Sequence, residues 1–531
     1  MRQFAARLLT NFGARKQSGA RNLFAKSNMP ASKLVLSIDQ GTSSTRVILF
    51  DAKANVRHIH QIEVEQINQH PGWCQMDPVA IMSSVNACAN AITVPEGATV
   101  AAVGITNQRE TTVVWDKKSG LPLADAVVWL DNRTRETVAK LVGKTPSNNK
   151  NHFQRICGLP IATYFSAVKL RWLIDNEPAV QEAHADGRLM FGTVDSWLIY
   201  NLTGGVDGGI HVTDVTNASR TMLMNLSTLQ WDKEIIEFFG FENVHLPEIK
   251  KSSDVFGIIK SGPFAGVPIS GCLGDQQAAL LGQRCIHPGD LKNTYGTGCF
   301  MLFNTGNEAV VPPSEYGLLT TVAYQLPDEP PKYALEGSIA IAGAAVRWLR
   351  DNLGIIQNAA EVGELASRVE DTGGVYFVTA FSGLYAPYWR DDARGCIIGL
   401  TQYTNKSHIC RATLESVCWQ TKEIVEMINK SSSTPLKRLK VDGGLTASDL
   451  CMQLQADLLG IPVERPSMAE TTAFGAAIAA GLGVGAWNRQ ELFEGDDFGE
   501  VKVFESVIEE EERNKRFLLW KKAVEKSFVS A

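Results

Sequence analysis

The sequence contains no run of 18 apolar residues, the length that a membrane-spanning helix requires. The longest candidate, residues 339–346, is far too short. The ten cysteines are scattered from Cys74 to Cys451 without any Cys-x-x-Cys pair, and the nine histidines show no metal-ligand spacing. These absences predict no transmembrane segment, and they favour free thiols over a disulfide framework or a zinc site.

The first 38 residues contain no acidic side chain, and the first carboxylate in the chain is Asp39. Residues 1–33 hold seven basic side chains. Four apolar side chains in this stretch recur at roughly helical spacing: Phe4, Leu8, Leu9 and Phe12. Such a basic amphipathic stretch is typical of a mitochondrial presequence, whereas a solvated basic tail or a start at Met29 are the alternatives. We expect residues 1–32 to be a basic leader and the protein to reside in the mitochondrion or the cytoplasm.

The rest of the chain is acidic and has an ordinary globular composition. Without the seven leader charges, the formal net charge of −6 becomes −13, which argues against nucleic acid as a partner. Hydrophobic residues make up 44% of the 531 residues and charged residues 20%. A chain of this length exceeds what one hydrophobic core organises, so two large domains are expected.

Strand and helix patterns alternate along the chain, which predicts an α/β fold. Strand pairs are predicted at three places: residues 34–38 with 46–50, 100–106 with 111–115, and 291–294 with 299–303. Helices are predicted over three segments: residues 164–176, 414–428 and 450–458. Gly460 is well placed to end the last of these helices.

The turn after the first predicted strand has the groups that a nucleotide phosphate requires. Phosphates need backbone N–H donors at close range, which glycine permits because it has no Cβ, and hydroxyl groups add further donors. A carboxylate is needed to hold Mg²⁺. These groups are supplied within six residues by Asp39, Gly41, Thr42, Ser43 and Ser44. For such a turn alone, a tight hairpin capped by its own side chains is the alternative.

Two further glycine turns strengthen the phosphate interpretation. Gly296-Thr297-Gly298 repeats the strand–turn–strand pattern in the second half of the chain, and Gly443-Gly444 precedes a predicted helix. The repeated pattern suggests two related domains that face each other across a cleft, with a boundary near residues 281–289. We therefore expect domains over residues 33–283 and 284–531.

Five motifs occur in a characteristic order: Asp-Gln-Gly-Thr at 39–42, Asn-Gln-Arg-Glu-Thr at 107–111, Gly-Asp-Gln-Gln at 274–277, Asn-Thr-Tyr-Gly-Thr-Gly-Cys-Phe at 293–300 and Asp-Gly-Gly at 442–444. This order resembles that of the glycerol kinases, a group of FGGY carbohydrate kinases in the actin/Hsp70/sugar-kinase superfamily. Residues 164–176 resemble the first signature of that family and residues 395–415 its second. The resemblance extends from about residue 33 to residue 526.

The resemblance implies two RNase H-like (actin-like ATPase) domains that bind ATP and an acceptor between them. It also implies that Asp39 orients Mg²⁺ and that the hydroxyls and amides of the first turn contact the phosphates. The positions that match nucleotide contacts are Thr42, Ser43, Ser44, Arg46, Thr297, Gly343, Arg347, Gly444 and Ser448.

The acceptor implied by the resemblance is glycerol, and the relatives it points to form dimers and tetramers, so we expect a homo-oligomer. Arg109 and Glu110 match the pair that holds glycerol, in which a guanidinium donates to two oxygens and a carboxylate accepts from two hydroxyls. Asp275 matches the general base, since phosphoryl transfer needs an acceptor for the proton of the attacking hydroxyl. The other matching positions are Gln276, Tyr164, Trp129 and Phe300, of which the last two line the carbon backbone.

Three features depart from the bacterial glycerol kinases. Arg347 stands where many of them have Gln, and Ser448 stands where Asn commonly touches adenine, so nucleotide affinity and base selectivity stay open. Residues 258–268 lack the Arg that binds fructose bisphosphate in bacterial enzymes. That allosteric control is therefore not expected here.

Two other functions compete with phosphorylation of glycerol. A pentulose or hexulose kinase is disfavoured because the bulk of Trp129 and Phe300 closes the pocket to longer sugars. A catalytically weak binding or scaffold protein is opposed by the intact Asp39, Arg109 and Asp275. The sequence therefore predicts an ATP-dependent kinase whose acceptor is glycerol.

Overall fold

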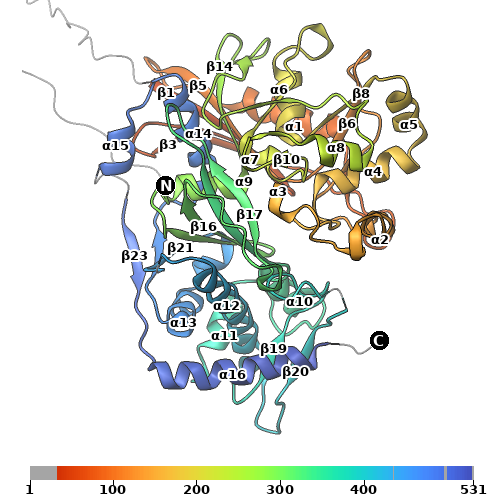
Figure 1. The fold of residues 1–531 in the computed structure, drawn as a ribbon. Helices are drawn as coiled ribbons and strands as arrows, with labels where there is room; N and C mark the ends of the chain where they lie inside the picture. The colour runs from red at the N-terminus through yellow and green to blue at the C-terminus, as the bar shows by residue number, and fades with distance from the viewer. Residues whose placement is uncertain (1–32, 391, 435, 496–498, 529–531) are drawn as a thin grey trace, which may run out of the picture.

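The computed structural model describes residues 33–528 except 391, 435 and 496–498. The predicted leader over residues 1–32 lies outside the described residues. Two sheets dominate the fold, one built from the first half of the chain and one from the second (Figure 1). Among the described helices, none is long and apolar enough to cross a bilayer.

The N-terminal sheet has six strands in the order β13-β14-β5-β1-β2-β3. Its central strand β1 is antiparallel to β2, which is antiparallel to β3, and on its other side β1 is parallel to β5, which is parallel to β14. The bounds are β1 Lys33–Gln40, β2 Ser44–Phe50, β3 Val56–Glu63, β5 Thr99–Asn107, β13 Gly257–Ile258 and β14 Pro268–Gly274.

The C-terminal sheet has seven strands in the order β17-β18-β16-β15-β21-β22-β23 and repeats this connectivity. Its central strand β15 is followed by two antiparallel neighbours, β16 and β18, and then by two parallel ones, β21 and β22. The bounds are β15 Leu291–Tyr295, β16 Cys299–Gly306, β17 Leu319–Tyr324, β18 Lys332–Ile339, β21 Leu439–Asp442, β22 Val463–Pro466 and β23 Val501–Phe504. The repeat is the RNase H-like arrangement, so the predicted fold class is confirmed.

Helices cover both sheets. The longer ones are α1 Pro78–Ala91, α2 Arg135–Lys144, α4 Ser166–Asn176, α6 Val194–Leu202, α10 Gly343–Asp351, α12 Lys406–Ser431, α13 Asp449–Leu459 and α16 Glu510–Lys526. The shorter helices include α3 Gln154–Cys157, α5 Pro178–Ala185, α7 Val215–Ala218, α8 Lys233–Phe239, α11 Glu361–Ala366 and α15 Arg489–Glu494. Gly460 ends α13 with a φ of 78°, as predicted, because a left-handed residue there satisfies the last helical carbonyls.

Among the described residues, ten short strands lie outside the two large sheets: β4 Gln75–Met76, β6 Val113–Asp116, β7 Ala126–Val127, β8 Leu189–Gly192, β9 Val212–Asp214, β10 Met224–Asn225, β11 Gln230–Trp231, β12 Glu248–Lys250, β19 Tyr376–Val378 and β20 Cys396–Ile398. The pairing of β6 differs from the pairing predicted from the sequence. The predicted pairing of residues 100–106 with 111–115 is wrong, because β6 pairs with β8 and not with β5. Glu110, with a φ of 57°, turns the chain away from the sheet between β5 and β6.

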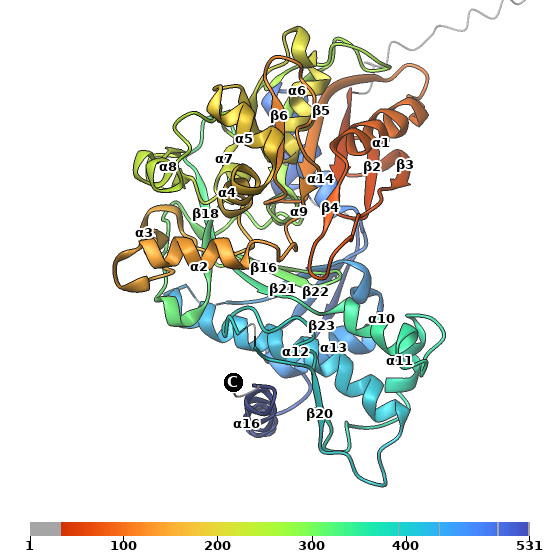
Figure 2. The ribbon, with the colours of Figure 1, turned by 90° about the vertical axis from the view of Figure 1, so that its right-hand side faces the viewer.

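Two helices join the halves. Helix α9 (Asp275–Gly282) and helix α14 (Thr471–Gly483) cross so closely that a Cβ on Gly475 would lie 1.8 Å from the Ala278 carbonyl oxygen. Although α14 comes late in the chain, it packs on the N-terminal sheet, where Gly104 faces Ala476 (Figures 1 and 2). The division at residues 283 and 284 thus stays a prediction, since the second half contributes a helix to the first. All ten cysteines are free, as expected.

Candidate active site

Two glycine turns meet at the carboxyl end of the central strand of the C-terminal sheet. The turn between β15 and β16 is closed by the Gly296 N–H, which donates to the Gly298 carbonyl at 2.9 Å. Gly443, with a φ of 92°, follows the neighbouring strand β21 and lies against Tyr295, whose carbonyl oxygen would be 2.5 Å from an added Cβ. Only glycine permits this approach, so the two turns present their backbones to one space.

The turn after β1 has a matching geometry in the N-terminal sheet. The Gly41 N–H donates to the Ser44 carbonyl at 2.9 Å, which leaves Ser43 exposed at the tip and Ser44 buried. Trp129 donates its indole Nε1–H to the Thr42 Oγ1 at 2.9 Å. Because the hydroxyl oxygen is used as an acceptor, the Thr42 O–H stays available as a donor.

Asp39 is the second-last residue of β1, just before that turn, and is 8% exposed. Its nearest cation is Arg46, whose Nη1 lies 3.8 Å from the Asp39 carboxylate and 3.3 Å from that of Glu470. Burial raises the pKa of Asp39 to about 7; Glu470 and Asp275 add to the rise and Arg46 opposes it. A carboxylate in this environment is suited to bind a cation, because a positive charge would relieve the cost of its burial.

Arg109 and Glu110 follow β5 and are buried, and each is paired with a residue other than its neighbour. Two guanidinium nitrogens of Arg109 donate to the Glu336 carboxylate, at 2.5 and 3.0 Å. The Arg220 Nε donates to the Glu110 carboxylate at 2.6 Å, and its Nη2 reaches Glu336 at 3.2 Å. Glu336 belongs to β18 of the C-terminal sheet, so the four charges connect the two halves.

The charges in this network are balanced by pairing. Burial alone would raise the pKa of Glu336, but Arg109 and Arg220 outweigh it and hold this pKa at about 2. Burial raises the pKa of Glu110, and Arg220 and Arg109 reduce that rise. Buried charges that share hydrogen bonds in this way hold their side chains in fixed positions.

Asp275 is the first residue of α9 and faces the same space. Its carboxylate lies 3.2 Å from the Arg109 Nε, and 30% of its side chain is exposed. Burial raises its pKa, while Arg109 and Lys292 oppose the rise. A carboxylate with a raised pKa that is still open to the cleft can accept a proton.

Gln276 has its side-chain orientation set by a buried lysine. The Lys292 Nζ donates to the Gln276 Oε1 at 2.5 Å and to the Thr294 Oγ1 at 2.8 Å. Since the amide oxygen of Gln276 is engaged, its NH₂ group is the part that remains for a ligand oxygen. Burial lowers the pKa of Lys292 to about 8, and Asp442 and Asp275 oppose this fall.

Three aromatic rings complete the wall beside Arg109. Trp129 lies edge-on to Phe300, with ring centroids 5.6 Å apart, and to Tyr164 at 5.8 Å. The Arg109 guanidinium lies 5.9 Å from the Phe300 ring centre and the Arg220 guanidinium 5.7 Å from that of Tyr164. The structure thus brings together the residues predicted to contact the acceptor: Arg109, Glu110, Trp129, Tyr164, Asp275, Gln276 and Phe300.

A cavity of about 750 Å³ opens beside the two C-terminal glycine turns. It is lined by five of the predicted nucleotide residues: Thr297, Gly343, Arg347, Gly444 and Ser448. The Arg347 Nη2 donates to the Thr297 Oγ1 at 3.2 Å, and the Ser448 Oγ accepts from the Cys451 N–H as the cap of α13. The volume is within the range of small-molecule sites.

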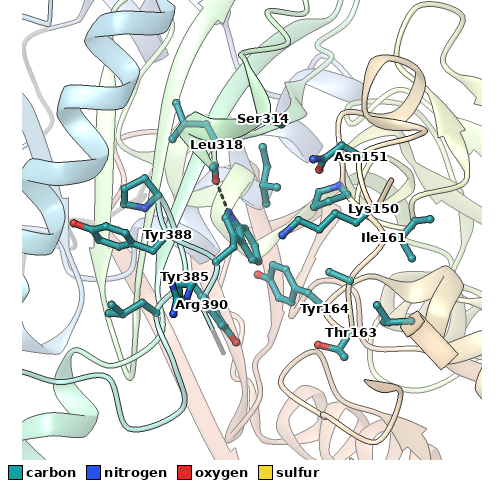
Figure 3. Close-up of a pocket in the computed structure, with 18 of the residues that line it drawn as sticks. Lys150, Asn151, Ile161, Thr163, Tyr164, Ser314, Leu318, Tyr385, Tyr388 and Arg390 are labelled. Atoms are coloured by element: carbon teal, nitrogen blue, oxygen red, sulfur yellow. Dashed lines mark hydrogen bonds between the residues drawn. The ribbon is translucent and has the colours of Figure 1, made fainter. Parts of the chain in front are cut away.

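Tyr164 also lines a second cavity, of about 430 Å³ (Figure 3). Lys150, Asn151 and Thr163 line it from the N-terminal half, and Tyr385 and Tyr388 line it from the C-terminal half (Figure 3). None of the sequence motifs predicts this space.

Three residues of the site were missed in the sequence: Arg220, Glu336 and Lys292. Each is a charged side chain next to or within a buried strand or helix, and Glu336 interrupts the apolar run of β18. A lone carboxylate in such a strand requires a buried partner. That signal could have identified Glu336, although not Arg109 as its partner.

Two family models match the chain in succession. The N-terminal domain of the FGGY family of carbohydrate kinases matches residues 34–282, and the C-terminal domain of that family matches residues 291–484. Among curated proteins, the chain is similar to a glycerol kinase of Renibacterium salmoninarum, with 52% identity over 93% of this chain and 98% of the relative. It is also similar to a glycerol kinase of Arabidopsis thaliana, with 52% identity over 93% of this chain and 97% of the relative.

Solved structures of carbohydrate kinases are also similar to this chain. The structure of Plasmodium falciparum glycerol kinase with ADP is 40% identical, with a TM-score of 0.85 over 94% of this chain and 99% of that one. A ligand-bound xylulose kinase from Lactobacillus acidophilus has a TM-score of 0.79 at 22% identity, over 93% of this chain and 99% of that one. At that identity the second likeness concerns the fold alone.

Proposed function

The chain belongs to the FGGY family of carbohydrate kinases, and we propose that its acceptor is glycerol. ATP and glycerol then give ADP and sn-glycerol 3-phosphate. The observation that carries this proposal is the grouping of the Arg109 guanidinium with the rings of Trp129 and Phe300, which we call the acceptor pocket together with Glu110. Curated relatives named glycerol kinase at about half identity over nearly the whole chain support it.

The paired charges suit a ligand with adjacent hydroxyls. Arg109 and Arg220 donate to carboxylates on one side, and Glu110 offers oxygens that accept from hydroxyls. The Gln276 NH₂, oriented by Lys292, supplies a donor beside them. The aromatic rings of Trp129 and Phe300 cover the carbon chain, which excludes water from the acceptor.

Asp275 is the proposed general base. The acceptor hydroxyl oxygen forms a bond to the γ-phosphorus of ATP, and the bond from that phosphorus to the bridging oxygen of ADP breaks. The hydroxyl proton passes to the Asp275 carboxylate, whose raised pKa supports this role. ADP leaves with the electron pair of the broken bond.

Nucleotide binding is proposed at the three glycine turns. Thr42, Ser43, Ser44 and Arg46 would contact the phosphates from the N-terminal side. Thr297, Gly343, Arg347, Gly444 and Ser448 line the cavity that would take the rest of the nucleotide. Gly296 and Gly444 are exposed at these turns, and this favours the assignment, because a backbone without a Cβ lets a phosphate approach closely.

Asp39 is the proposed residue for Mg²⁺, which accompanies ATP and neutralises phosphate charge during transfer. The fit is good, because no described residue donates a hydrogen bond to its carboxylate and the pKa of Asp39 is raised to about 7.

Location and assembly are proposed from the sequence. The basic leader favours the mitochondrion, with the cytoplasm as the alternative, and imaging of a fusion of residues 1–33 separates the two. We also propose a homo-oligomer, a dimer or tetramer, which sedimentation velocity would test. No nucleic-acid partner is proposed for this acidic chain.

A coupled assay of ADP release tests the acceptor. It compares glycerol, dihydroxyacetone, xylulose and ribulose at saturating ATP and Mg²⁺. We expect kcat/KM to be highest for glycerol. An equal or higher value for a pentulose would instead favour the second candidate, a pentulose kinase.

A further inference from the structure

The second cavity shares one residue, Tyr164, with the residues proposed to hold the acceptor. Tyr164 contacts Trp129 on the acceptor side and is at the same time a wall of the 430 Å³ cavity. Its ring is tilted against Tyr385 of the C-terminal half, with centroids 6.4 Å apart (Figure 3). The two tyrosines therefore form a partition between the acceptor pocket and the cavity.

Tyr385 is held firmly in this position. Its ring stacks on Trp389 at a centroid distance of 5.6 Å, and the Trp389 Nε1–H donates to the Gly317 carbonyl at 2.7 Å. The loop is closed by two backbone bonds between Leu384 and Arg390, at 2.8 and 2.9 Å. A ring fixed from behind in this way acts as a wall rather than as a mobile side chain.

Tyr164 connects Tyr385 to the residues proposed to hold the acceptor. The Tyr164 ring contacts Trp129 on one side and Tyr385 on another, and the Arg220 guanidinium, which donates to Glu110, lies 5.7 Å from its centre. Glu110 is one of the two residues proposed to hold the acceptor. A ligand that extends from Glu110 past Tyr164 would therefore meet Tyr385 before it reached the cavity.

The cavity behind the partition is suited to additional hydroxyl groups. Asn151, Gln154 and Thr163 offer amide and hydroxyl groups along one wall. The aromatic rings of Tyr385 and Trp389 also line the cavity. Polar groups combined with aromatic faces are typical of small-ligand sites.

We propose that Tyr385, together with Tyr164, sets the maximum length of the acceptor and that removal of the Tyr385 ring admits longer linear polyols into the cavity. The inference rests on the proposed function, because it takes the pocket beside Glu110 as the acceptor site. The loop at residues 384–390, in the second half of the chain, would then determine acceptor specificity. None of the sequence motifs indicates this role.

The test measures kcat/KM for glycerol and for the four-carbon polyol erythritol in Tyr385→Ala. We expect the ratio of erythritol to glycerol to rise at least about tenfold over wild type, as for other changes of pocket volume. Tyr385→Phe is the matched control, since it keeps the ring and removes only the hydroxyl, and its ratio should stay within about twofold of wild type. Lys150→Ala, which changes a different residue of the cavity lining, should likewise leave the ratio unchanged.

An unchanged ratio in a Tyr385→Ala protein with a wild-type circular dichroism spectrum would overturn the proposal. If that variant fails to fold, Tyr385→Leu is used instead and is judged by the same ratio. Wild-type activity separates this inference from the proposed function. If the wild-type protein prefers another acceptor, the assignment of glycerol fails. The role of Tyr385 is then tested by whether Tyr385→Ala phosphorylates a compound one carbon longer than that acceptor.

Discussion

The Glu336 carboxylate accepts two hydrogen bonds from the Arg109 guanidinium, at 2.5 and 3.0 Å, and so joins the C-terminal sheet to the acceptor pocket of the N-terminal half. Arg220 reaches the same carboxylate at 3.2 Å. The arginine proposed to hold glycerol is therefore positioned by a residue 227 places further along the chain. The contact between Arg109 and Glu336 therefore joins the two halves of the protein and also positions a residue of the proposed acceptor pocket.

Glu336→Gln should weaken both stability and acceptor binding. The change leaves two buried guanidinium groups without their shared counter-charge, which costs about 3–5 kcal/mol when a buried pair is broken. We expect a lower melting temperature and a higher KM for glycerol, with a smaller effect on KM for ATP. Calorimetry and steady-state kinetics measure these quantities.

The matched control for that change is Glu329→Gln, which removes an exposed pair with Arg489 at 2.9 Å. An exposed pair contributes about 0–1 kcal/mol, so this variant should melt near wild type. Equal melting temperatures for the two variants, with an unchanged KM for glycerol, would contradict the positioning role of Glu336.

Lys292→Met should raise KM for glycerol about tenfold or more. The substitution removes the charged hydrogen bond that fixes the Gln276 amide, and such bonds contribute about 1.5–3 kcal/mol. Lys440→Met is the control, because Lys440 lies opposite Lys292 on the neighbouring strand but donates, within the described part of the chain, only to the carbonyls of Gln283 and Arg284. If both variants raise KM equally, Lys292 has no specific role in orienting Gln276.

Asp275→Asn should lower kcat by about 10²–10⁴-fold while glycerol binds almost as well as to wild type. The amide keeps the size of the side chain but cannot accept the proton. Single-turnover kinetics measure the chemical step and titration calorimetry measures glycerol binding. A kcat within about tenfold of wild type would remove Asp275 from the role of base.

Glu423→Gln should change how stability depends on pH. Burial raises the pKa of Glu423 from its ordinary 4.5 to about 7, and the hydrogen bond from the Tyr388 hydroxyl, at 2.5 Å, opposes the rise. The folded state thus favours the protonated form, so this stabilisation is complete below about pH 4.5 and is lost as the pH rises through 7. Its size is about 3 kcal/mol at most.

Glutamine does not titrate, so the melting temperature of Glu423→Gln minus that of wild type should increase between pH 5 and pH 8. The difference cancels the titration of the other buried groups, such as Asp214, whose pKa is also raised to about 7 by burial and by Asp195. A difference that stays constant over this range would mean that Glu423 is ionised throughout.

Local patterns were sufficient to predict the central strands and the turns that follow them. Residues 34–38 and 299–303 are apolar runs next to glycine turns, and residues 291–294 lead into the second of these turns, so both conclusions need only neighbouring residues. The spacing of residues 450–458 and Gly460 likewise identified α13. Residue types in the right order also pointed to the acceptor and nucleotide contacts, which the fold brings into one cleft.

Long-range contacts could not be predicted in this way. The pairing of β6 with β8 depends on residues some 75 positions apart, and the positive φ of Glu110 that directs it leaves no mark in the composition. Helix α14 reads as an ordinary helix of the second half, yet it packs on the first sheet. Glu336 and Tyr385 acquire their significance only from partners that the fold brings to them.

The most direct test of glycerol phosphorylation is ³¹P NMR of ATP, Mg²⁺ and glycerol with the purified wild-type protein. We expect the γ-phosphate signal of ATP to disappear as one phosphomonoester signal grows in equal amount. That product should be fully oxidised by a dehydrogenase specific for sn-glycerol 3-phosphate. Formation of inorganic phosphate alone, or no loss of ATP with glycerol while a pentulose is phosphorylated, would contradict it.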